Sequence, residues 1–133
     1  MKRTHYDSGT QWEPLVGYSR AVRVGPTIHV SGTTAVDDQG QVLAPGDCYG
    51  QAVHILAKIE TALKALGADL KDVVRTRMYV TDIEHWSDIG RAHREVFGDI
   101  RPATSLVEVS RLISPEILVE IEVDAISGKS SGE

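Results

Sequence analysis

The chain has a single cysteine, Cys48, among its 133 residues, so no disulfide can form within it. This cysteine usage fits a reducing compartment. No apolar run approaches the ~20 residues that a membrane-spanning helix needs. The first residues, MKRTHYDSGTQWEP, also lack the apolar segment of a secretory signal. We therefore expect a cytoplasmic protein with no membrane partner.

Basic residues are also scarce, because 14 Lys and Arg stand against 19 Asp and Glu and the net charge is −5. Such a chain lacks the positive field on which non-specific nucleic-acid binding relies, so we expect no nucleic-acid partner. The five histidines show no metal-ligand spacing, and no glycine-rich loop resembles a phosphate cradle. We predict no metal site.

What is present is the pattern of one α+β domain, with a hydrophobic fraction of 41%. We expect a loosely structured lead-in over 1–15, a single domain over 16–126 and a flexible tail over 127–133. The expected elements have the order ββαβαββ: strands 19–24 and 27–34 around a Gly25-Pro26 turn, a helix from Asp47 to about 66, strand 73–81, helix 82–97, and strands 104–110 and 118–126.

The segment from Arg101 to Ala125 contains the most informative pattern. It reads as two alternating strands joined by a short Ser-Pro turn. In the second strand Glu120, Glu122 and Asp124 lie on one face, because side chains alternate along a strand. A face with three carboxylates must be solvated, paired with cations or used in function.

Two helices cannot cover both faces of such a sheet, so we expect both on one face of a mixed sheet. On strand 73–81 the side chains expected to face these helices are Val74, Thr76, Met78 and Val80. The open face would then carry Arg75, Arg77, Tyr79, Leu106, Leu118 and the three acids. We expect this face to meet another subunit, and a solvated face with weak surface pairs is the alternative.

Four segments resemble the RidA family, also called YjgF and often labelled translation-initiation inhibitor or L-PSP endoribonuclease. They are VGYSRAVRVGPTIHVSG, ALGADLKDVVRTRMYVTD, RPATSLVEVSRL and LVEIEVDAI, and the resemblance runs from about Val16 to Ala125. The resemblance implies a chorismate-mutase-like fold and a homotrimer with clefts between subunits. It also implies hydrolysis of enamines and imines to carbonyl compounds and ammonia, without metal or organic cofactor.

The family cleft maps unevenly onto this chain. The resemblance assigns Tyr18 and Ser31 to substrate binding, and Glu120 to positioning or activating a water. Thr104 stands where active members carry the arginine that grips a substrate carboxylate through two hydrogen bonds, which a hydroxyl cannot reproduce. Gly90 stands where many members carry a ligand-contacting asparagine.

Two further residues are candidates for this cleft. Arg101 could supply the missing cation, as could Arg75 or Arg77, although Arg101 also fits a solvent-facing turn residue. His93 lies on the apolar stripe of the second helix, three residues after Gly90, and titrates near neutral pH. We hypothesise that His93 takes part in the site; a core histidine with one hydrogen bond is the alternative.

Three functions remain open from the sequence. The first is a RidA-like hydrolase with altered substrate preference, binding its small-molecule ligand at subunit interfaces. The second is a non-catalytic ligand-binding or regulatory trimer that keeps the cleft. The third is an interaction protein of the holdase type. The sequence does not name the physiological substrate.

Overall fold

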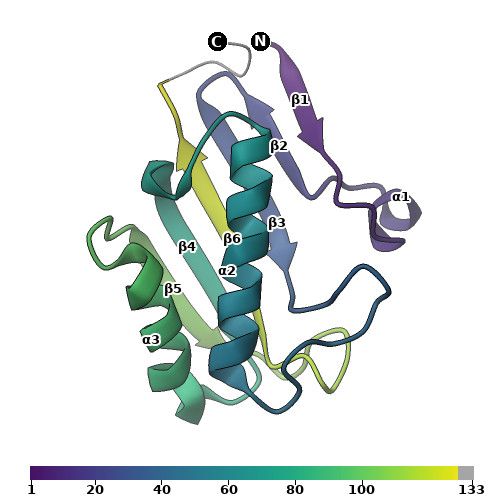
Figure 1. The fold of residues 1–133 in the computed structure, drawn as a ribbon, viewed down its shortest axis with the longest axis vertical. Helices are drawn as coiled ribbons and strands as arrows, with labels where there is room; N and C mark the ends of the chain where they lie inside the picture. Colours follow the sequence, from purple (N-terminus) through teal and green to yellow (C-terminus); the bar gives the residue numbers. More distant parts are fainter. Residues whose placement is uncertain (129–133) are drawn as a thin grey trace.

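The computed structural model describes residues 1–128 and has two layers, a six-stranded β-sheet and a pair of helices on one of its faces (Figure 1). Helix α2 spans Cys48–Ala65 and helix α3 spans Trp86–Phe97. The two helices pack against each other and against the sheet. This arrangement confirms the predicted α+β fold of the chorismate-mutase-like type, with both long helices on one side.

The sheet has the strand order β1-β2-β3-β6-β4-β5, and only the β4–β5 pair is parallel. The strands are β1 Arg3–Tyr6, β2 Ala21–Val24, β3 Thr27–Thr33, β4 Val73–Val80, β5 Ala103–Glu108 and β6 Val119–Ile126. From β2 onward the elements follow the predicted order ββαβαββ. The short helices are α1 Trp12–Val16, η1 Leu70–Asp72 and η2 Ile83–His85.

Strands β5 and β6 are not neighbours, although the sequence interpretation joined them by a short turn. Strand β4 lies between them, pairing with β5 on one side and β6 on the other. The cause is the crossover through α3, which returns the chain parallel to β4 and leaves only its outer edge for β5. Leu106 is the register partner of the buried Met78, so it packs against the core and not on the open face as predicted. Leu118, just before β6, also packs against the core.

A bulge at the start of β4 changes which valine is buried. The pairing with β6 shifts register between Val73 and Arg75. Val73 is therefore 3% exposed and Val74 is 43% exposed, the reverse of the expected alternation. From Thr76 onward the predicted faces hold, because Thr76, Met78 and Val80 are buried beneath the helices.

Helix α2 supplies much of the core. Its N-cap is Asp47, as predicted, whose carboxylate accepts a hydrogen bond from the Gly50 N–H. Its buried stripe includes Ile55, Ile59 and Leu63, all at 0% exposure, facing the buried side chains of β6. Within residues 1–128, no helix combines the length and apolar character that crossing a membrane requires.

Residues 1–15 differ from the loosely structured lead-in that the sequence predicts. Strand β1 pairs with β2 as the edge strand of the sheet, and α1 follows it. The strand was missed because its four residues, RTHY, have no apolar alternation. Backbone pairing with β2, the packing of Tyr6 on the core and a hydrogen bond between His5 and Ser19 hold it in the sheet. Most of the tail predicted for 127–133 lies outside the described residues.

Candidate functional site

Glu120 lies on β6 and points away from α2 and α3, over the backbone of Gly32 in β3. Strand β3 has one extra residue between Val30 and Thr33, so the backbone at Gly32 bulges toward the acid. A Cβ atom at Gly32 would lie only 2.9 Å from Glu120 Cδ, closer than real Cβ contacts allow. The Glu120 carboxylate can therefore lie over Gly32 only because this residue has no side chain.

Replacing Gly32 by Ala is expected to displace the Glu120 carboxylate with little effect on stability, because a flexible side chain can yield to the new methyl group. If Glu120 is catalytic, a displacement of about 1 Å should lower the turnover rate on the order of 100-fold. Turnover and thermal unfolding of the Gly32→Ala variant would be compared. A variant that unfolds as native but retains full turnover would contradict this role of Gly32.

Glu120 differs from the other two acids of its strand. Glu122 accepts a hydrogen bond from Tyr79 at 2.9 Å, and Asp124 accepts one from Arg77 at 2.8 Å. Within residues 1–128, no hydrogen bond reaches the Glu120 carboxylate. Burial raises the pKa of Glu120, the charge of Glu122 raises it further, and Arg20 opposes both. Glu120 is thus the acid of this strand that is suited to exchange protons.

Arg20 anchors the surroundings of Glu120. This residue is 7% exposed, and its guanidinium donates to the Gly32 carbonyl oxygen at 2.6 Å and to the Tyr18 hydroxyl at 3.0 Å. It also pairs at 3.4 Å with Glu13, which is 2% exposed. Burial favours the neutral form of Glu13, but hydrogen bonds from Ser8 and Thr10, together with Arg20, lower its pKa overall. Arg20 therefore carries a buried charge that fixes Tyr18 and Gly32 together.

Three of the predicted site residues line one hollow of about 1140 Å³: Tyr18, Ser31 and Glu120. The Ser31 hydroxyl donates to the Ser19 carbonyl oxygen at 2.7 Å, so its oxygen retains acceptor capacity. Arg20 and Gly32 also line this hollow. We call these five residues the Glu120 half-site.

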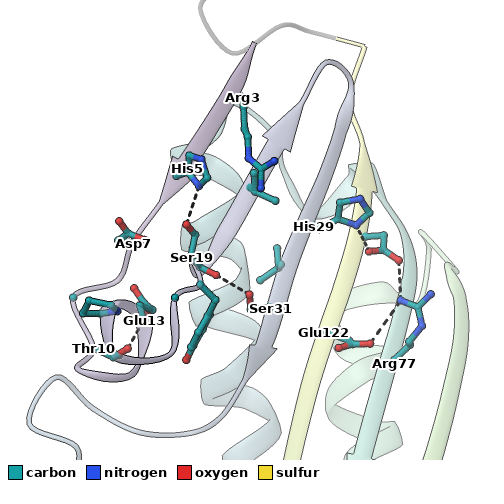
Figure 2. A pocket seen from close by; sticks show the side chains of 17 residues that line it. Arg3, His5, Asp7, Thr10, Glu13, Ser19, His29, Ser31, Arg77 and Glu122 are labelled. Carbon is teal, nitrogen blue, oxygen red and sulfur yellow. Dashed lines mark hydrogen bonds and ion pairs between the residues drawn. The ribbon is translucent and has the colours of Figure 1, made fainter. Parts of the chain in front are cut away.

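The open face of the sheet carries a second hollow of about 930 Å³, drawn in Figure 2. His29 approaches Asp124 to 2.7 Å, and Arg77 reaches from β4 toward Glu122, as the dashed lines show. These contacts confirm that the open face places cationic side chains beside acids. They also divide the three acids, since Glu122 and Asp124 are paired and Glu120 is not.

Thr104 lies on the other side of the sheet. It is the register partner of Thr76, whose side chain is fully buried on the helix-covered face. The Thr104 and Thr76 hydroxyl oxygens are 2.8 Å apart, and Thr76 Oγ1 is 2.9 Å from His93 Nε2. The structure therefore brings Thr104 and His93 together through Thr76, a residue that the sequence interpretation did not single out for function.

His93 and Gly90 lie one turn apart on α3, and so share a helix face. A Cβ atom at Gly90 would meet nothing within 4 Å, so space is open beside it. Burial lowers the pKa of His93, which keeps the imidazole neutral at pH 7. The His93 ring also packs against Phe97 with centroids 4.7 Å apart. We call Thr76, Gly90, His93 and Thr104 the Thr104 half-site.

The arginines proposed as substitute cations do not gather around Thr104. Arg75 and Arg77 project from the open face of β4, where Arg75 donates to Ser105 and Arg77 to Asp124. Arg101 is exposed and has a left-handed backbone, with φ of 55°. Within the described part of the chain, no arginine side chain hydrogen-bonds to a member of the Thr104 half-site.

Apart from Arg101, which belongs to neither, the predicted site residues thus form two groups on opposite faces of one sheet. The hollow that Glu120 lines includes none of Thr104, Gly90 and His93. Across residues 1–128, no group of three His, Cys, Asp or Glu side chains is arranged to hold a metal ion. Sequence reasoning missed Arg20, Gly32 and Thr76, because only tertiary contacts distinguish them from ordinary strand residues.

Comparison with known proteins gives a consistent answer. The family model described as Endoribonuclease L-PSP matches residues 9–127. The 3-aminoacrylate deaminase RutC of Acinetobacter baylyi is 32% identical, over 81% of this chain and 85% of its own length. A RutC family protein of Pyrococcus abyssi is 34% identical, over 85% of this chain and 88% of its own length.

Solved structures agree with this result. A Mycobacterium tuberculosis member of the YjgF/YER057c/UK114 family is 51% identical with a TM-score of 0.85, covering 94% of this chain and 99% of the other. Escherichia coli TdcF with bound serine is 26% identical with a TM-score of 0.75, covering 84% of this chain and 88% of the other.

Proposed function

This chain belongs to the Endoribonuclease L-PSP family, which includes RutC and YjgF proteins, and from this premise we propose that it hydrolyses reactive enamines or imines. The products would be a carbonyl compound and ammonia. The observation that carries the proposal is the Glu120 carboxylate, which is half-buried, without a hydrogen-bond partner in residues 1–128 and raised in pKa. The deaminase name of the A. baylyi relative supports this reaction class.

The chemistry would use Glu120 as a base. An enamine first gains a proton at carbon and becomes an iminium ion. Glu120 then removes a proton from water as the water oxygen bonds to the electrophilic carbon. The same carboxyl returns that proton to nitrogen, and the C–N bond then breaks to release ammonia. As it breaks, the remaining hydroxyl proton passes to the Glu120 carboxylate and on to solvent, which leaves the carbonyl and replaces the proton taken up by the enamine. General acid–base assistance of this kind contributes a factor of about 10²–10⁴.

We propose that the two half-sites meet across an interface between copies of the chain, in a homotrimer. The rim of the Glu120 hollow supports a covering partner, because it includes Trp12, Val16 and Ile113, which are 45%, 69% and 73% exposed. Exposed apolar groups gathered at a hollow are typical of protein contacts. Light scattering would test the assembly, and a monodisperse monomer at micromolar concentration would contradict it.

The test of the activity generates imines in situ and follows their decay with and without the protein. An amino-acid oxidase supplies 2-imino acids, and an amine oxidase supplies imines without a carboxylate. Acceleration above the spontaneous rate supports the hydrolase. The alternative, a non-catalytic ligand-binding trimer in a cytoplasmic setting, is favoured by Thr104 in the place of an arginine. It predicts no acceleration by the native chain but clear acceleration by Thr104→Arg.

The pH dependence gives a sharper check on Glu120. A base acts only when ionised, so kcat/KM should fall as the pH drops through the pKa of Glu120. Because burial raises this pKa, the acid limb should lie above 4.5, the ordinary value of a glutamate. Rates corrected for spontaneous hydrolysis would be measured from pH 4 to pH 9. An acid limb at or below the ordinary value would argue against Glu120 as the base.

A further inference from the structure

Three hydrogen bonds connect the interior of the protein to its surface at the Thr104 half-site. His93 Nε2 lies 2.9 Å from Thr76 Oγ1, and Thr76 Oγ1 lies 2.8 Å from Thr104 Oγ1. Thr104 Oγ1 in turn donates to the carbonyl oxygen of Pro102 at 3.1 Å. Thr76 is fully buried and Thr104 is exposed, so this chain of bonds ends where a ligand can reach it.

The Pro102 carbonyl, at the exposed end of this series of hydrogen bonds, determines which atom donates in each bond. The Pro102 carbonyl oxygen can only accept, so it uses the single hydroxyl proton of Thr104. Thr76 must then donate its own proton to Thr104, because Thr104 has none left. His93 must donate from Nε2–H to Thr76 for the same reason. Only this order satisfies all three bonds, and it assigns the Nε2–H tautomer to His93.

The consequence for Thr104 is a defined polarity. A hydroxyl oxygen has two lone pairs, and the bond from Thr76 occupies one of them. The other is directed to the exposed side of Thr104 as a hydrogen-bond acceptor. The open space beside Gly90, one turn before His93, leaves room for a ligand next to this half-site. The group that fits such an acceptor is an N–H donor, whereas a carboxylate would meet it lone pair to lone pair.

We propose that Thr76 and His93 are positioning residues that hold the Thr104 oxygen as an acceptor for the N–H group of an uncharged ligand, such as a primary amide. This inference deepens the proposed function and rests on it for the chemistry at Glu120. It names the substrate class as enamines or imines that carry an uncharged N–H group in the place of a carboxylate. Recognition at Thr104 is nevertheless measurable without any turnover.

The experiment measures binding to the native protein with three small probes of similar shape. Propanamide carries N–H donors, propanoate carries only acceptors, and N,N-dimethylpropanamide has an amide oxygen but no N–H. Chemical-shift changes at the Thr104, Thr76 and His93 amides would be followed by NMR titration. We expect propanamide to bind at least about tenfold more tightly than either other probe. Equal binding of the three probes, a preference for propanoate, or no shift with any probe would overturn the proposal.

Two variants separate positioning from mere structural support. Thr76→Val keeps the shape but removes the bond that holds the Thr104 hydroxyl in place. The hydroxyl can then rotate away from the Pro102 carbonyl and point its proton toward a ligand, so the preference for propanamide should fall toward unity. Thr76→Ser restores the hydroxyl and should restore the preference. Thr61→Val, on the exposed side of α2, is a matched control that should leave the preference unchanged. An unchanged preference in Thr76→Val would contradict the proposal even if that variant were destabilised.

The tautomer of His93 is a second and independent readout. Nitrogen chemical shifts of the native imidazole should report a proton on Nε2, with Nδ1 unprotonated, and Thr76→Val should shift the ring toward a mixture of tautomers. A native ring protonated on Nδ1 alone would overturn the assigned bond order. Because neither readout involves catalysis, failure of imine hydrolysis would count against the proposed function and the substrate class, and would leave the recognition of an N–H group at Thr104 standing.

Discussion

Replacing Glu120 by Gln is expected to lower kcat/KM for imine hydrolysis by a factor of about 10²–10⁴, the usual contribution of a general base. Gln has the shape of Glu but no basic carboxylate, so it fills the space over Gly32 without accepting a proton. Folding should be preserved, because no hydrogen bond within residues 1–128 depends on the Glu120 carboxylate. Thermal unfolding recorded alongside the rate would show whether removing this half-buried charge changes the stability of the protein.

The matched control for this variant is Glu60→Gln on the outer surface of α2. Glu60 loses only an exposed pair with Lys64, so activity should remain native. An equal loss of activity in both variants would point to a general effect of charge on the protein. Retention of native kcat/KM by Glu120→Gln would remove the hydrolase mechanism in the form given above.

Replacing Arg20 by Met is expected to destabilise the protein by about 3–5 kcal/mol, the typical cost of breaking a buried ion pair by removing one partner. The variant leaves Glu13 buried beside an apolar side chain, and it removes the donors to the Gly32 carbonyl and the Tyr18 hydroxyl. Chemical denaturation followed by circular dichroism would measure the change in the free energy of unfolding.

Lys64→Met provides the comparison for Arg20. It breaks the exposed pair between Lys64 and Glu60 on α2, which should contribute only about 0.3–0.5 kcal/mol. If both variants changed the unfolding free energy by similarly small amounts, Arg20 would not be the structural anchor described here. A large loss of unfolding free energy in Arg20→Met alone would show that Arg20, which contacts both Glu13 and Tyr18, anchors this region.

Much of the fold could be predicted because its signals are local. The stripe of Ile55, Ile59 and Leu63 and the cap at Asp47 are properties of one helix, and both appear as expected. The insertion of β4 between β5 and β6 could not be predicted in this way. The strand that β5 pairs with depends on how the crossover through α3 returns to the sheet. The sequence of β5 does not indicate whether its partner is β4 or β6.

The candidate site likewise contains residues that could be predicted from local sequence and residues that could not. The positions of Glu120, Tyr18 and Ser31 follow from strand alternation and from the family resemblance. Thr76 could not be recognised, because a buried threonine on a strand has no distinctive pattern until its bonds to His93 and Thr104 are known. The one-residue shift at Val73 shows a further limit, since a bulge reverses the faces expected from alternation.

If the proposed trimer forms, the placement of the Glu120 and Thr104 half-sites on opposite faces of one sheet has a genetic consequence. In a ring of three copies, each cleft would take Glu120 from one chain and Thr104 from its neighbour. A chain defective only in the first half and a chain defective only in the second would then share clefts in which both halves are intact. Two such alleles, each inactive alone, should complement each other when expressed in one cell. Diluting the native protein until its subunits separate should abolish its activity.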